Sequence, residues 1–324
     1  MGVIRPPGDA TQTGDMATIV DTATRVAPTW MAWVPTAALV WAASYGGLRV
    51  WFATGHAPQW KLPGRDLLAP DWIAVVGCLV SAAAVIALGR LPRSRPLIRS
   101  LWVLAAGWIA AAAFALLDVV AGVLPGLGIP FDLPGMLSRF TALGGAVLLA
   151  GTALAHQRRL DPTCLRCSGQ ARPTSTPHWP AWLAVAGCLT RLTAQAVVDF
   201  GSTPYNSTPY NSSLSRIIFE GGFVLAGVAL PLLLVYRAGR IFPRWMLLLP
   251  GIGLGAGITA YFGVGLLQMI ANVLQGKPAY DDVGLPESFF WVAVPAYLVW
   301  GVSLSIAAYG YYRRTRKPCK GCGR

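Results

Sequence analysis

The stretch "LWVLAAGWIAAAAFALLDVVAGVL", Leu101–Leu124, has 24 residues and a single charged side chain, that of Asp118. About 20 consecutive apolar residues are enough for an α-helix to cross the hydrocarbon core of a bilayer. The stretch lacks the alternation of polar and apolar residues that a membrane β-strand requires. It therefore predicts a transmembrane helix that carries a carboxylate inside the membrane.

Seven further blocks of the chain have the same character. Over the whole chain 55% of the residues are hydrophobic and 12% are charged, whereas soluble domains carry about 25% charged residues. The sequence therefore predicts an all-α polytopic membrane protein with eight spans. The lipid bilayer is the partner that these spans require. The predicted spans are Trp30–Ala53, Trp72–Gly89, Leu101–Leu124, Leu133–His156, Ala181–Phe200, Ile217–Tyr236, Trp245–Leu274 and Phe289–Tyr312.

The basic residues predict how the spans are oriented. Both tails and the even-numbered connections hold 19 of the 26 basic residues, whereas the opposite loops hold only Lys61, Arg65 and Lys277. Basic residues are retained on the cytoplasmic side, so we expect a multi-pass protein of the plasma membrane with both termini in the cytoplasm. The net charge of +13 thus indicates topology, and no nucleic-acid partner is expected.

Sequence similarity between the two halves predicts an internal duplication. "ALLDVVAGVLPG" (Ala115–Gly126) resembles "GLLQMIANVLQG" (Gly265–Gly276) at an offset of 150 residues, and "GRLP" at Gly89 resembles "GRIFP" at Gly239. Four spans are an even number, so both copies enter the membrane in the same direction. This predicts parallel tandem repeats related by an axis along the membrane normal, as opposed to inverted repeats.

The predicted organisation follows from this repeat. Residues 1–27 are expected to form a flexible cytoplasmic tail, without the features of a cleaved signal peptide. Residues 28–169 form the first four-span repeat, residues 170–178 a linker, and residues 179–324 the second four-span repeat with a basic C-terminal tail. Each repeat ends in a Cys-x-x-Cys motif that follows an Arg-Arg pair, and the two motifs align at an offset of 155 residues.

The two motifs supply four cysteines, Cys164, Cys167, Cys319 and Cys322. Two Cys-x-x-Cys pairs can hold one tetrahedral zinc ion through four thiolates. We therefore expect a shared zinc site that forms where the two repeats meet on the cytoplasmic face. Two alternatives stay open: the pairs are redox-active dithiols, or they bind no metal or a different one. A reducing cytoplasm argues against structural disulfides.

Polar residues inside the spans form a second set of candidates. A charge at membrane depth costs at least about 2.5–3.5 kcal/mol on insertion scales, so such residues turn inward and pair or line water. Two hypotheses compete: ion pairs that join helices, with Asp118 bound to Arg139 or to Arg191, or an outward-open cavity for a polar or anionic ligand. The ligand or ion-pair candidates are Asp118, Arg139, Arg191, Arg216, Glu220 and Gln268, the last at the place in the second repeat that matches Asp118.

No sequence motif indicates catalysis. The chain has no Walker loop, no Ser-His-Asp arrangement and no His/Glu metal set, which argues against a hydrolase or an ATPase. Three function classes remain, and the balance favours a protein that is not an enzyme. The first handles a solute, an ion or a lipid through an outward-facing polar cavity. The second is a scaffold that assembles a protein partner through the zinc clasp, and the third is a membrane thiol oxidoreductase.

Overall fold

The fold is all-helical throughout the part of the chain that the computed structural model describes, namely residues 28–61, 66–123, 131–160, 177–198, 218, 221–280 and 285–316. Five helices are long and apolar enough to cross a membrane, which is the architecture of a helical membrane protein. They are α3 (Asp71–Arg90), α6 (Leu133–Leu160), α7 (Trp179–Val198), α10 (Arg244–Leu274) and α11 (Glu287–Thr315).

The other three predicted spans are helical but differ from these five. Helix α2 (Trp30–Trp51) has 22 residues but is less apolar, and it continues into a π-helical turn, Phe52–His56. Helices α4 (Arg95–Ala111) and α5 (Ala115–Val123) are long and apolar enough for a span only when taken together, and a bend of 46° separates them. The apolar helix that ends with α9 (Leu230–Val235) is shorter than a span within the described residues. The count of eight spans therefore stays a prediction.

The bend between α4 and α5 interrupts the stretch that was predicted to be one continuous span. At the break the carbonyl of Ala111 accepts a hydrogen bond of 3.0 Å from the backbone N–H of Leu68. An inserted donor of this kind is a recognised cause of a sharp kink. Alanine favours a continuous helix, so the bend in this alanine run is explained by a contact that is distant in sequence.

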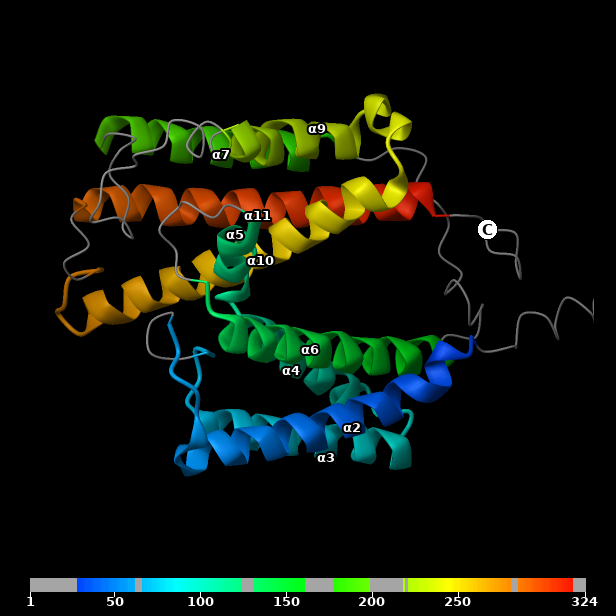
Figure 1. Ribbon diagram of the computed structural model, residues 1–324. Coiled ribbons are helices and arrows are strands. Elements are labelled where there is room, and N and C mark those ends of the chain that lie inside the picture. Colours follow the sequence, from blue (N-terminus) through cyan, green and yellow to red (C-terminus); the bar gives the residue numbers. More distant parts are fainter. Residues whose placement is uncertain are drawn as a thin grey trace, which may run out of the picture.

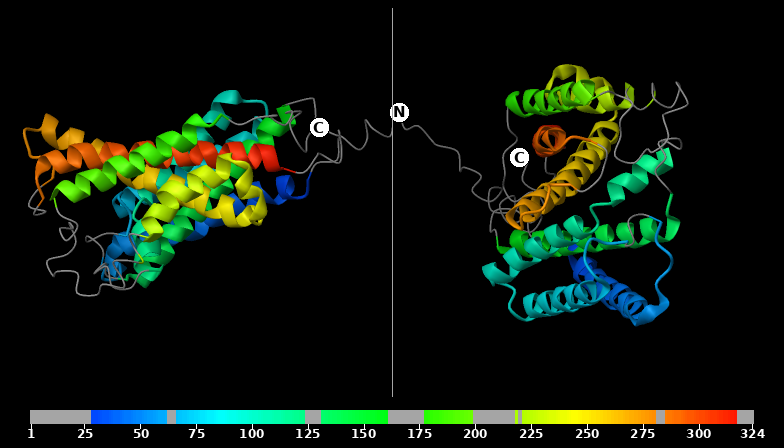
Figure 2. Two further views of the ribbon diagram at one scale, coloured as in Figure 1. Left: turned by 90° about the horizontal axis from the view of Figure 1, so that it is seen from above. Right: turned by 90° about the vertical axis from the view of Figure 1, so that its left-hand side faces the viewer.

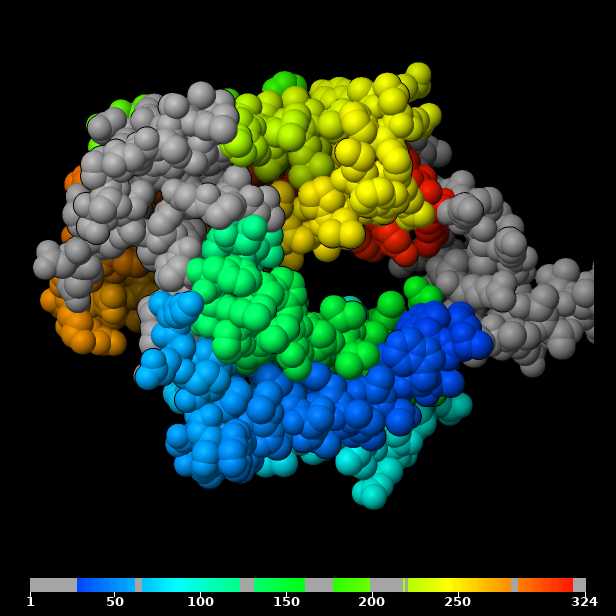
Figure 3. All heavy atoms as spheres, viewed as in Figure 1, coloured from blue at the N-terminus to red at the C-terminus, as the bar shows by residue number. Residues whose placement is uncertain are grey.

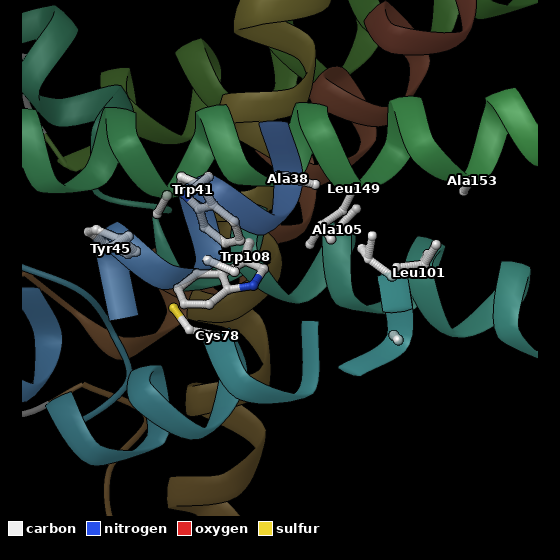
Figure 4. Close-up of a cluster of buried hydrophobic side chains, with 14 of the residues drawn as sticks. Ala38, Trp41, Tyr45, Cys78, Leu101, Ala105, Trp108, Leu149 and Ala153 are labelled. Carbon is white, nitrogen blue, oxygen red and sulfur yellow. The ribbon is translucent and has the colours of Figure 1, made fainter. Parts of the chain in front are cut away.

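Helices α2, α3, α4 and α6 form the first helix group, which has an aromatic core (Figure 4). The rings of Trp41 and Trp108 meet edge to face at 5.3 Å, and Tyr45 stacks on Trp41 at 5.9 Å. Each indole N–H has an acceptor: Trp41 donates to the carbonyl of Thr141 at 2.9 Å and Trp108 donates to the hydroxyl of Ser81 at 3.2 Å. Buried aromatic side chains of this size dominate the packing energy of a core.

Helices α7, α9, α10 and α11 form the second helix group, in which α11 packs against both α7 and α10 (Figure 2). This group packs through small residues. A Cβ atom at Gly251 would lie 3.1 Å from Ala308, and one at Gly255 would lie 2.5 Å from Ser305 Oγ. Gly251 and Gly255, four residues apart, thus form a small-x-x-x-small contact surface against α11. Gly253 takes no part in this contact, because nothing lies within 4 Å of its Cβ position.

Helix α5 lies between the two groups and joins them (Figure 1). Its Leu116 packs against Gly257 of α10, and the ring of the preceding Phe114 lies 5.9 Å from that of Tyr261. Away from α5 the groups diverge, and an opening separates α6 from α10 and α11 (Figure 3). The two groups thus meet over a limited area around α5.

Both groups begin and end at the same end of the bundle (Figure 1). In the first group Arg159 of α6 donates to the carbonyl of Met31 at 3.1 Å, and in the second group Arg244 of α10 donates to the carbonyl of Tyr312 at 3.1 Å. This end carries the Arg-Arg pairs that precede the cysteine motifs. The opposite end of the first group holds the polar residues described next.

Candidate functional site: a buried polar network

Asp118 and Arg139 form the central ion pair of the site. Arg139 Nη1 lies 2.7 Å from Asp118 Oδ1 and 2.8 Å from Oδ2, and both side chains are fully buried. Asp118 belongs to α5 and Arg139 to α6, so the pair ties the joining helix to the first group. Of the two pairings that the sequence left open for Asp118, the structure contains the one with Arg139.

Asp66 lies immediately before α3 and connects this pair to α2. Its Oδ2 accepts a hydrogen bond from the hydroxyl of Ser138 and another, of 2.5 Å, from Nη1 of Arg49. Its backbone carbonyl accepts a hydrogen bond of 2.6 Å from Nε of Arg139. Only 3% of Asp66 is exposed. A residue of a connecting segment is thus held by arginines from two helices, Arg49 at its carboxylate and Arg139 at its backbone carbonyl.

Asp71 is the member of the site that reaches the surface. Its Oδ1 lies 3.3 Å from the same Arg49 Nη1 atom that binds Asp66, and its side chain is 30% exposed. Arg49 itself is fully buried, and its Nε and Nη2 atoms have no hydrogen-bond partner. Its guanidinium carbon lies 5.5 Å from the Tyr45 ring and 5.9 Å from the Phe52 ring. Arg49 is therefore held by one nitrogen atom and by ring contacts.

Asp132 caps the N-terminus of α6 beside this pair. Its Oδ1 accepts from the N–H of Gly135 and its Oδ2 from the N–H of Lys61, both at 3.2 Å. An aspartate in this position satisfies a free N–H of the first helical turn. A Cβ atom at Gly135 would lie 2.5 Å from Asp132 and 3.1 Å from Arg139 Nη2, so the glycine provides the space that both side chains occupy.

These residues, with the hydrogen-bonded hydroxyls of Tyr45 and Ser138 at 2.9 Å, form what we call the polar network. Within it four carboxylates face two guanidinium groups. Burial strengthens each charge interaction, and it also makes any unbalanced charge expensive. The network comprises Tyr45, Arg49, Asp66, Asp71, Asp118, Asp132, Ser138 and Arg139.

Of the other sequence candidates, Arg191 and Gln268 lie within the described residues, and neither joins the polar network. Arg191 lies in the second helix group, where its Nη2 donates to Gln195 Oε1 at 3.4 Å. Gln268, the counterpart of the buried Asp118 in the predicted repeat, is exposed. Arg216 and Glu220 lie outside the described residues. Asp118 thus pairs with Arg139 and not with Arg191.

The predicted zinc ligands Cys164, Cys167, Cys319 and Cys322 also lie outside the described residues. Within the part of the chain that is described, no three or more His, Cys, Asp or Glu side chains form a group that could hold a metal ion. The four carboxylates of the polar network are instead engaged by arginine side chains and backbone N–H groups. The zinc site therefore stays a prediction from the sequence.

Asp66, Asp71 and Asp132 were not among the sequence candidates, because they fall in predicted loops or at span ends. One signal pointed to them. Arg49 lies inside the first predicted span and needs a buried partner, and Asp66 and Asp71 follow in the next connection.

No protein-family model, no curated protein and no solved structure matches the chain.

Proposed function

We propose that the chain is an ion- or solute-handling protein of the plasma membrane, with eight spans in two tandem four-helix units and both termini in the cytoplasm. The separate cores of the two helix groups and the common end at which both groups begin and end support this arrangement. With the arginine-rich end in the cytoplasm, the polar network lies toward the outer surface.

The ligand that the polar network fits best is a small cation, a proton included. Among its described residues four carboxylates, of which Asp71 is partly exposed, outnumber two guanidinium groups, and a bound cation would offset this negative charge. This differs from the polar or anionic ligand expected from the sequence. The partly exposed Asp71 gives a cation access from the end of the bundle.

The observation that carries the proposal is the sharing of one nitrogen atom by two carboxylates. Arg49 Nη1 contacts both the buried Asp66 and the partly exposed Asp71. A cation that binds these carboxylates competes with Arg49 for the same oxygens. Because the rest of its guanidinium makes no hydrogen bonds within the described residues, Asp66 and Asp71 provide the charged contacts that hold Arg49, and a cation that takes their oxygens moves charge within α2.

Charge movement in proteoliposomes tests this proposal. We expect steps in pH or in the concentration of Na⁺ or K⁺ to produce a transient current on a solid-supported membrane. Replacement of Asp66 by Asn, or of Asp71 by Asn, is expected to weaken the apparent cation affinity by about tenfold, the equivalent of about 1.4 kcal/mol. The reason is that each change removes one carboxylate from the pair that the cation bridges.

The matched control is Glu287→Gln. Glu287 is a carboxylate at the same end of the bundle, but it belongs to α11 and accepts hydrogen bonds from Ala279 N and Trp291 Nε1. This variant should keep the wild-type current. If none of the three cations moves charge in the wild-type protein, the proposed ligand class is wrong.

The alternatives from the sequence depend on the cysteine motifs. A scaffold that binds a partner through a zinc clasp and a thiol oxidoreductase both require Cys164, Cys167, Cys319 and Cys322, and no described contact favours either role. The polar network gives the solute-handling class a specific arrangement of charges, and for that reason we rank it first.

A further inference from the structure

Arg191 of α7 has surroundings unlike those of the arginines in the polar network. It is the thirteenth of the 20 residues of the helix, which places it about 18 Å along the axis from the start of α7. Its guanidinium carbon lies 4.6 Å from the Phe223 ring and 5.4 Å from the Tyr297 ring. None of the ion pairs between described residues involves Arg191.

The contacts of Arg191 leave part of its charge uncompensated. Its Nε atom is buried without a hydrogen-bond partner. Its polar partners within the described residues, the amide of Gln195 at 3.4 Å from Nη2 and the hydroxyl of Tyr297, are both neutral. Ring contacts offset some of the cost of a cation at membrane depth, but less than a carboxylate does. The two arginines of the polar network each have an aspartate partner, whereas within the described residues Arg191 has aromatic rings in that role.

The aromatic residues around Arg191 form an apolar wall. The Tyr297 ring stacks on that of Phe262 at 3.8 Å with an angle of 6° between their planes, and Phe223 meets Trp300 edge to face at 4.8 Å. Arg191 itself is half-buried, so part of its side chain stays accessible beside this aromatic wall.

We infer that Arg191 binds the anionic head of an amphiphile, a carboxylate or a phosphate, whose apolar part lies along the aromatic wall of Phe223, Phe262 and Tyr297. The guanidinium presents its N–H groups in one plane, which matches the oxygens of a carboxylate or a phosphate. Gln195, one turn further along α7, lies beside the same head group. This site is in the second helix group and does not depend on the cation site proposed for the first.

Two sources can supply such a head group: a lipid of the surrounding bilayer or a free anionic solute. The two acidic residues closest to this region in sequence, Asp199 and Glu220, lie outside the described residues. An intramolecular partner from either of them is the competing explanation. The experiment has to separate all three.

The test is a titration by native mass spectrometry of the full-length protein in nanodiscs of neutral lipid. Dioleoylphosphatidylglycerol and oleate are the membrane probes, and inorganic phosphate and acetate are the free probes. We expect at least one class of probe to bind the wild-type protein with a stoichiometry of one. Arg191→Gln should weaken that binding by about tenfold or more, the loss expected when a hydrogen bond to a charged group is removed.

Two further variants keep the experiment interpretable. Arg158→Gln removes another arginine that lies over an aromatic ring, with its guanidinium carbon 5.4 Å from Trp30, but at the end of a helix, and its probe binding should stay at the wild-type level. Arg191→Lys keeps the charge and supports folding if Arg191→Gln does not, and it should bind the probe more weakly than the wild type because lysine lacks the planar donor set.

The outcomes separate the explanations. Loss of phosphatidylglycerol or oleate binding in Arg191→Gln identifies a lipid site, and loss of phosphate or acetate binding identifies a site for a free anion. Equal probe binding in the wild type and in Arg191→Gln overturns the inference. It is also overturned if Asp199→Asn or Glu220→Gln destabilises the protein as much as Arg191→Gln and the matching double variant recovers the loss, because the counter-ion is then internal.

Discussion

Replacement of Arg139 by Gln is expected to lower the free energy of unfolding by about 3–5 kcal/mol, the cost of leaving one partner of a buried pair without the other. The change leaves Asp118 fully buried without its guanidinium partner. It also removes the 2.6 Å hydrogen bond from Nε of Arg139 to the carbonyl of Asp66. Two contacts that join α5 and the segment before α3 to α6 are thus lost together.

A double-mutant cycle with Asp118→Asn measures the coupling directly. The double variant should recover part of the loss, because two neutral amides replace two unpaired charges. Arg90→Gln, at the exposed end of α3, is the control and should stay within about 0.5 kcal/mol of the wild type. Thermal unfolding in the same detergent measures the change in stability of all four variants: Arg139→Gln, Asp118→Asn, the double variant and Arg90→Gln. Additive losses in the two single variants would show that Asp118 and Arg139 do not interact.

Replacement of Gly255 by Ala is expected to destabilise the protein by about 1–3 kcal/mol, the usual cost of overpacking a tight contact. The new Cβ would lie 2.5 Å from Ser305 Oγ and 2.9 Å from the backbone nitrogen of Ser305. The hydroxyl can rotate away, but the backbone of α11 cannot. Helices α10 and α11 must therefore move apart.

Gly253→Ala is the matched control on the same helix. Nothing lies within 4 Å of its Cβ position, so the gain in helix propensity should leave the stability unchanged or raise it by up to about 1 kcal/mol. Unfolding of both variants in the same detergent distinguishes packing from propensity. Equal effects at the two positions would mean that the contact between α10 and α11 is not as tight as described.

The positions of the long helices followed from the sequence because membrane insertion depends on local composition. Helix α10 begins one residue before the predicted span and ends at the predicted residue, and α3 is one residue longer at each end. The break at Ala111 could not be predicted in this way. Alanine favours a continuous helix, and the interruption depends on Leu68, 43 residues earlier in the chain.

The candidate site was predicted in part for the same reason. Asp118 and Arg139 carry charges at similar depth in neighbouring spans, so their pairing was one of two foreseen. The burial of Asp66 was not foreseen, because connecting segments normally lie on the surface. Gln268 shows the limit of the repeat: the match with Asp118 in sequence does not extend to its surroundings, since Asp118 is buried against Arg139 and Gln268 is exposed.

The central claim, a polar network that opens toward the outer side of the membrane, is tested most directly by thiol labelling in intact cells. The test uses a chain whose four motif cysteines are replaced by Ser. The remaining cysteines of this chain, Cys78 and Cys188, are buried. A single new cysteine is introduced, either as Asp71→Cys or as Gln157→Cys. Asp71 is 30% exposed at the end with the polar network, and Gln157 is exposed near the opposite end of α6. A membrane-impermeant maleimide added outside should label Asp71→Cys, and it should label Gln157→Cys only after the membrane is permeabilised. Labelling of Gln157→Cys in intact cells, with Asp71→Cys protected, would contradict the account.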